Sequence, residues 1–164
     1  MHTRSVLSIA LAIAITAAAF AQPRSRASDD ADQRELYNYS LTMDKIRKVA
    51  DATASFADFA KKHPELQGQS SNSKNLDEMV RKFEKYPEAV AILKQQGLTP
   101  REYAVGVLTL MQASMAVGFK KSGAYKEYPP DMLKLVSKPN LDFVDQHYDE
   151  IVKLTAKMQP KDDQ

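Results

Sequence analysis

The sequence predicts an all-α protein, a single helical bundle of four main helices around a buried central helix (99–122), with one helix broken by a proline. Three observations lead to this fold class. Apolar residues recur at helical spacing along most of the chain. Capping residues mark where several of these segments begin and end. No internal repeat and no second regime of composition divides the chain, which favours one domain.

The first 21 residues have the layout of a secretory signal peptide. His2 and Arg4 form a basic front, residues 6–20 form an apolar run, and Ala19-Phe20-Ala21 is a small-x-small cleavage site. We therefore expect cleavage after Ala21 and a periplasmic or secreted location. The polar residues that follow predict a disordered leader over 22–35. An all-α domain is expected over 36–159 and a disordered tail over 160–164.

Residues in the sequence mark where the central helix begins and ends. Thr99 is a good N-cap, Pro100 suits the first helical position, and Glu102 stands where it completes a capping box. Its middle, Tyr103–Phe119, has no charge over 17 residues, whereas a membrane span needs about 20 apolar ones. Its polar residues, Thr109 among them, fall on one narrow face shared with Ala113 and Ala116. Met115, Phe119 and the other large apolar residues occupy the broad arc that is expected to face the core. This favours a core helix of a soluble bundle with one edge in water over a membrane span.

The remaining elements are predicted from the spacing of apolar residues and from residues that end helices. Residues 37–42 alternate with period two, which predicts an extended arm or, as the alternative, the first turns of the next helix. A helix from about Met43 to Lys62 follows the cap Thr42, and another begins after Asn75 and is either kinked or broken at Pro87. A short helical piece at 130–136 precedes a long amphipathic helix at about 140–158.

Composition excludes several classes of function. The chain has 23 basic and 21 acidic residues, a formal net charge of +2, which gives no argument for a nucleic-acid or an anionic-lipid partner. It has no cysteine, so thiol chemistry and disulfides are absent. Its glycines are too dispersed for a phosphate-binding loop. The sequence therefore predicts a non-catalytic binding or interaction protein of the cell envelope. Its partner is another envelope protein or a small apolar ligand, and no stable membrane span remains after signal removal.

The alternative is a small-ligand carrier or an enzyme with a pocket centred on His147. Tyr103, Tyr148 and Gln112 are the candidate polar neighbours in such a pocket. The helical phase surrounds His147 with Phe143 and other apolar residues, which favours a structural histidine over a catalytic one.

No cofactor or metal is expected. The acidic strip Asp142, Asp145 and Asp149 is typical of a solvated helix face. Met43 and His147 are the residue types that hold haem in small bundles, but the chain has no C-x-x-C-H motif. If their helices are antiparallel neighbours, the two residues lie about 18 Å apart along the helices and cannot share one iron.

One short motif resembles a known family. Leu98-Thr99-Pro100-Arg101-Glu102 is similar to the L-T-x-x-Q motif that begins helices in periplasmic stress chaperones with a helical cradle, with Glu102 in place of glutamine. Leu108-Thr109-Leu110-Met111-Gln112 matches every letter, in the middle of the central helix. The resemblance implies a periplasmic chaperone-like function as a further alternative.

Overall fold

The computed structural model describes residues 26–63, 73–156 and 158, and all regular secondary structure in them is helical. This confirms the all-α class. The predicted signal peptide, the tail at 160–164 and most of the polar loop after Lys62 lie outside the described residues. The helices are α1 (Arg26–Asn38), α2 (Met43–Lys62), α3 (Leu76–Glu84), α4 (Pro87–Gln95), α5 (Pro100–Lys121), α6 (Met132–Leu135), α7 (Lys138–Gln146) and α8 (Tyr148–Ala156).

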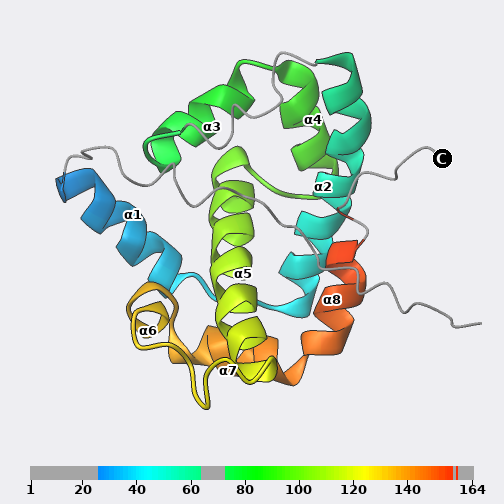
Figure 1. Ribbon diagram of the computed structural model, residues 1–164. Helices are drawn as coiled ribbons and strands as arrows, with labels where there is room; N and C mark the ends of the chain where they lie inside the picture. The colour runs from blue at the N-terminus through cyan, green and yellow to red at the C-terminus, as the bar shows by residue number, and fades with distance from the viewer. Residues whose placement is uncertain (1–25, 64–72, 157, 159–164) are drawn as a thin grey trace, which may run out of the picture.

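Helix α5 is the central element, with α1, α2, α3, α4, α6 and α7 packed around it (Figure 1). Its predicted ends are confirmed. The Glu102 amide donates to Thr99 Oγ1 at 3.1 Å, and the Thr99 amide donates to Glu102 Oε2 at 2.9 Å, so the capping box is complete. At the other end Gly123 adopts a φ of +78°, the left-handed conformation that closes a helix. By length and composition alone α5 passes as a membrane span, but half of its apolar window is buried in the fold.

The side of α5 that faces the core differs from the prediction. Thr109, Ala113 and Ala116 were expected at the wet edge, yet all three are completely buried, while Met115 and Phe119 are 46% and 42% exposed. The small alanines let neighbouring elements approach α5 closely. The Thr109 hydroxyl is satisfied because it donates to the Leu36 carbonyl at 3.3 Å. The predicted polar stripe is therefore wrong, and α5 presents apolar side chains to solvent instead.

The start signals of α2, α3 and α4 are confirmed. Thr42 Oγ1 accepts from the Lys45 amide at 3.3 Å, and Asn75 Oδ1 accepts from the Glu78 amide at 2.8 Å. The proline-containing helix is broken rather than kinked: α3 ends at Glu84 and Pro87 is the first residue of α4. The short piece expected at 130–136 is α6.

The prediction of one long helix at 140–158 is wrong, because this segment divides at His147 into α7 and α8. Helix α7 crosses under the end of α5, and α8 turns away to run beside α2 (Figure 1). The break loses few hydrogen bonds. The His147 amide still donates to the Phe143 carbonyl at 3.1 Å, and the His147 carbonyl accepts from the Ile151 amide at 2.9 Å. Packing on two different helices thus overrides a continuous amphipathic pattern.

Helix α1 corrects the prediction of a disordered leader for residues 26–35; residues 22–25 lie outside the described part. Its polar sequence is held by bonds to other elements more than by an apolar face of its own. Asp32 Oδ2 accepts from the Leu76 amide at 2.8 Å, and Glu35 forms an ion pair with Arg101 at 2.6 Å. Leu36 is the one large apolar side chain that it buries among its described residues. The expected extended arm is reduced to the linker 39–42.

Candidate interaction site at the C-terminal end of α5

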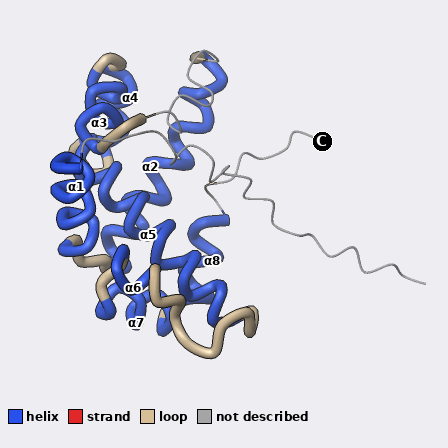
Figure 2. The backbone as a smooth tube through the Cα atoms, turned by 60° about the vertical axis from the view of Figure 1, so that its left-hand side comes forward, coloured by secondary structure: helices blue, strands red, loops and turns tan. Residues whose placement is uncertain are grey.

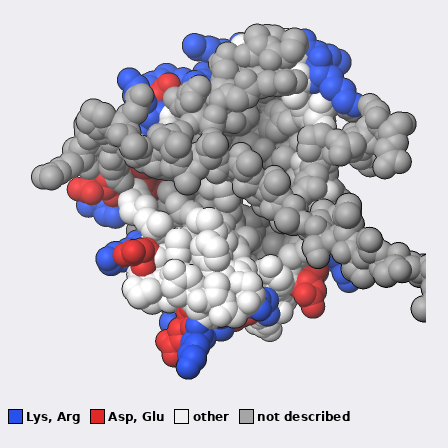
Figure 3. Space-filling view, viewed as in Figure 1, with Lys and Arg blue, Asp and Glu red and all other residues white. Residues whose placement is uncertain are grey.

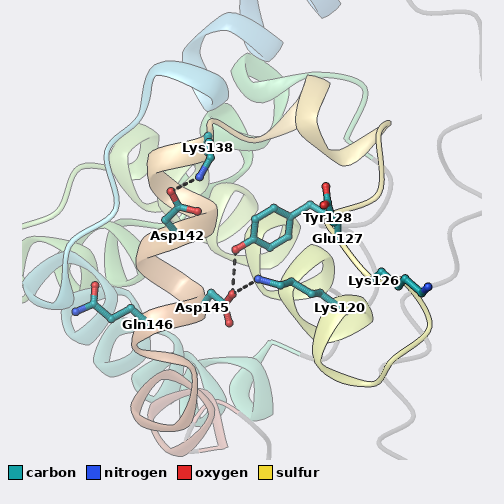
Figure 4. Close-up of a pocket in the computed structure, with 8 residues that line it drawn as sticks. All are labelled: Lys120, Lys126, Glu127, Tyr128, Lys138, Asp142, Asp145 and Gln146. Carbon is teal, nitrogen blue, oxygen red and sulfur yellow. Dashed lines mark hydrogen bonds and ion pairs between the residues drawn. The ribbon is translucent and has the colours of Figure 1, made fainter.

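Asp145 on α7 is the centre of a polar cluster that joins three segments. Lys120 and Lys121, in the last turn of α5, lie 2.6 Å and 2.9 Å from its two oxygens. Tyr128, in the loop before α6, donates its hydroxyl to the same carboxylate at 3.1 Å (Figure 4). The Lys120 ammonium also stands 4.6 Å from the centre of the Tyr128 ring. One carboxylate therefore ties the end of α5 and the following loop to α7.

Electrostatics at this cluster follow from its hydrogen bonds. The bond from Lys120 and then that from Lys121 lower the pKa of Asp145 to about 2, because both favour the charged carboxylate. The bond to Asp145 raises the pKa of Lys120 for the reciprocal reason. Burial, followed by the bond to the Asp145 carboxylate, raises the pKa of Tyr128. The low pKa of Asp145 and the raised pKa of Lys120 therefore keep this carboxylate and this ammonium charged at neutral pH.

An open pocket of about 670 Å³ lies beside the cluster, between α7 and the loop after α5. Lys138 and Asp142 on its wall pair with each other at 2.6 Å. Lys126 and Glu127 at its mouth have neither an ion pair nor a hydrogen bond to any described residue. Figure 4 shows Lys126 pointing away from Asp145. Most polar groups of the pocket are thus used within the protein, and the groups left for a partner are these two charges and the Gln146 amide.

An exposed apolar surface lies next to the pocket, and we call it the apolar end. Its centre is continuous, since Met115 and Phe119 are one helical turn apart on α5 and the Phe119 and Tyr125 ring centres are 6.0 Å apart. Leu133 of α6 and Val152 of α8 come from the elements on either side of this end of α5 (Figure 1). All five side chains are between 42% and 48% exposed. Figure 3 shows a broad uncharged surface over α6 and the C-terminal half of α5.

The structure does not bring together the four residues expected around His147. Tyr103 lies near the start of α5, where its hydroxyl contacts Thr53 Oγ1 at 2.8 Å. Tyr148 lies near Gly118, whose added Cβ would come within 3.7 Å of the Tyr148 hydroxyl oxygen. Fifteen residues of helix separate Tyr103 from Gly118, a rise of about 22 Å. Tyr103 and Tyr148 therefore cannot share one small-ligand site.

His147 and Gln112 are also apart from the pocket described above. The His147 ring is half-buried and packs 4.7 Å from the Phe143 ring, centre to centre. It lines neither of the two main pockets among the described residues. Gln112 has a buried Oε1 atom without a hydrogen-bond partner in the described part of the chain. The geometry at His147 is that of a packed side chain at a helix junction.

The acidic strip expected on the last helix is divided by ion pairs. Asp142 pairs with Lys138 and Asp145 with two lysines, and no group of three potential metal ligands occurs within residues 26–63, 73–156 and 158. Helices α2 and α8 run parallel, whereas the separation expected between Met43 and His147 assumed antiparallel helices. Arg47 pairs with Glu150 at 2.7 Å, and Phe56 and Met158, each further along the chain, pack against the same apolar cluster. Neither Met43 nor His147 lines a main pocket in the described part.

Sequence reasoning missed the apolar end for an identifiable reason. It placed Met115 and Phe119 on the arc expected to face the core, since they are apolar and in phase with Val107 and Leu110. The cluster at Asp145 gave no sequence signal, because its lysines stand 25 and 24 residues from the carboxylate.

Comparison with known proteins does not assign the chain to a family. No family model, no curated protein and no solved structure matches it.

The Asp145 cluster predicts a specific dependence of stability on pH. The pKa of this carboxyl is about 2 in the folded protein, against about 3.9 when unfolded. Between these values the unfolded state binds more protons, so the stabilisation is present above pH ~4 and is lost as the pH falls toward ~2. After allowance for solvent screening we expect a loss of about 1 kcal/mol in the free energy of unfolding.

Urea unfolding at several pH values between neutral and strongly acidic measures this loss. The Asp145→Asn variant should lack it, while Asp142→Asn, which removes an exposed ion pair, should titrate like the wild type. Equal acid sensitivity in the wild type and Asp145→Asn would contradict the assignment.

Proposed function

We propose that this protein is an exported, non-catalytic binding protein of the cell envelope that holds another protein at the apolar end. The observation that carries the proposal is the concentration of exposed large hydrophobic side chains there. Of the six that the described residues expose, five belong to this surface and only Tyr37 of α1 does not. Isolated exposed apolar residues are ordinary, but a contiguous group of them is typical of an interaction site.

The composition of the surface supports a protein as the partner. Two aromatic rings and a methionine stand at its centre, residue types that are enriched in the buried parts of protein interfaces. The elements around it carry both lysines and acidic residues, as in the neighbouring Lys126 and Glu127. Such a mixed rim does not favour nucleic acid or an anionic membrane, each of which selects a surface of one positive sign.

The neighbouring polar pocket supports binding rather than catalysis. A catalytic site needs a general base or nucleophile whose reactive atom is free to meet a substrate. Asp145 instead accepts bonds from two lysines and a tyrosine, and Asp142 accepts from Lys138. These groups hold the loop after α5 in place beside the apolar end, which gives that surface a fixed shape before a partner arrives.

Site-specific photo-crosslinking in the cells that produce the protein tests this function. A photoreactive phenylalanine analogue at position 119 should give crosslinked protein adducts. The same analogue at position 37 is the matched control, because Tyr37 is 40% exposed and lies on α1. Adducts at 119 that are absent at 37 support the proposal. No adduct at 119, or the same adducts at both positions, would overturn it.

The envelope location rests on the N-terminal segment and needs its own measurement. Cell fractionation should find the protein outside the cytoplasm, and N-terminal sequencing should begin at Gln22. A cytoplasmic protein that retains residues 1–21 would contradict export while leaving the binding surface to be judged by crosslinking.

A further inference from the structure

We propose that the occupant of the apolar end is a second copy of this chain, bound about a two-fold axis with Lys126 of each copy facing Glu127 of the other. The inference rests on the proposed function, since it names the partner of the same surface. It is carried by three properties of the described residues: the area of the apolar end, the balance of charge around it, and the two unpaired charges on its protruding loop.

The exposed apolar area is of the size that one side of a stable dimer needs. Each of the five side chains is between 42% and 48% exposed. At no more than about 200 Å² for each side chain, the value for an aromatic one, they present at most roughly 450 Å² of apolar surface together. A standard interface buries about 800 Å² on each partner, of which somewhat more than half, or about 450 Å², is apolar. The apolar end is therefore large enough to supply most of the apolar part of one interface.

The segment that supplies the loop after α5 and helices α6, α7 and α8 carries a balanced charge, which favours the approach of a second copy. Between residues 121 and 153, five lysines and five acidic residues are exposed. A two-fold interface brings the same patch of both copies together, so a rim of one sign would place like charges opposite each other. A rim with equal numbers of both signs can pair with itself instead.

The loop between α5 and α6 supplies the pair that is specific to a second copy. Figure 2 shows this loop projecting from the body beyond the ends of the helices. Lys126 and Glu127 are adjacent and exposed on it, and neither has a partner among the described residues. About a two-fold axis, a contact from Lys126 to the Glu127 of the other copy necessarily occurs twice. An unrelated partner has no reason to show this reciprocity.

The reciprocity gives a sharp experiment with the full chain. Sedimentation equilibrium over a range of concentrations should show a monomer–dimer equilibrium for the wild type. Phe119→Ser should weaken it about 30-fold, the effect of truncating a central aromatic residue. Tyr37→Ser, the control on α1, should leave it unchanged. Far-UV circular dichroism and urea unfolding verify that each variant is folded.

The two loop charges then test the symmetry. Lys126→Glu alone, or Glu127→Lys alone, places like charges opposite each other at two places and should weaken association about 10-fold. The double variant Lys126→Glu/Glu127→Lys restores both opposite-charge contacts and should return to within about 3-fold of the wild type. Failure of the double variant to recover would overturn the proposed pairing.

The outcome for the second copy is separable from the outcome for the proposed function. If the wild-type protein stays monomeric at every concentration, the proposal of a second copy is overturned. If position 119 then crosslinks to a different protein, the proposed function stands without it. If position 119 gives an adduct of twice the chain mass that contains only this chain, both are supported. If position 119 gives no protein adduct and the chain is monomeric, both are wrong.

Discussion

Leu110→Asp is expected to abolish the cooperative unfolding transition of this protein. The Leu110 side chain is 4% exposed and belongs to the largest apolar cluster, which joins α5 to α2, α6, α7 and α8. A carboxylate at this position would lie among apolar side chains. Lys45 lines the same small cavity, but its ammonium already donates to the Ser40 carbonyl at 2.8 Å, so burial of the carboxylate costs several kcal/mol. That loss is comparable with the whole stability of an ordinary domain, about 5–15 kcal/mol. Urea unfolding followed by circular dichroism measures the transition.

Met115→Asp is the matched control, because it makes the same change five residues further along the same helix. Met115 is 46% exposed, so its replacement should alter the free energy of unfolding in dilute solution by about 0.5 kcal/mol or less. If the second copy binds at the apolar end, the same variant should lose association while it keeps its fold. Equal damage from both substitutions would show that Met115 is buried after all.

Asn140→Ala is expected to destabilise the protein by about 2–4 kcal/mol, the second largest effect of a single change considered for this chain. Asn140 is 3% exposed and clamps the linker between α1 and α2 onto α7. Its Nδ2 donates to the Tyr39 carbonyl at 2.6 Å, and its Oδ1 accepts from the Leu41 amide at 2.9 Å. Without the side chain, two backbone groups in a buried region lose their partners.

The comparison that isolates this effect is Asn75→Ala. Asn75 also bonds to a backbone amide, but as the N-cap of α3 at a half-buried site. Water can replace that bond, so its removal should cost about 1 kcal/mol. Urea unfolding of both variants gives the two free energies. A loss at Asn140 no larger than the loss at Asn75 would contradict the clamp.

The sequence predicted helix boundaries well wherever the signal is local. The Thr99 cap with Glu102, the Asn75 cap and the break at Pro87 each depend on residues within one turn of each other. Such interactions act on a segment whatever surrounds it, because they satisfy or remove hydrogen bonds of its own backbone. These three predictions are confirmed by the hydrogen bonds and helix bounds of the structure.

Helix α1 and the division at His147 show where local reasoning failed. The α1 segment is polar, and its order comes from Asp32 and Glu35 bonding to α3 and α5, whose residues lie 44 and 66 positions further along the chain. The last helix has an unbroken amphipathic pattern, yet its two halves pack on different partners. In both cases the deciding contacts join residues that are distant in sequence, and no local pattern records them.

The sequence by itself determined that the chain is helical, where its core helix begins and ends, and that it carries no cysteine chemistry. Only the tertiary structure decided which side of α5 faces the core. Thr109, Ala113 and Ala116 are buried because small side chains let neighbouring helices come close, although their hydropathy is lower than that of Met115 and Phe119. Shape thus prevailed over hydropathy, and the larger apolar residues were left at the surface, where the proposed binding site lies.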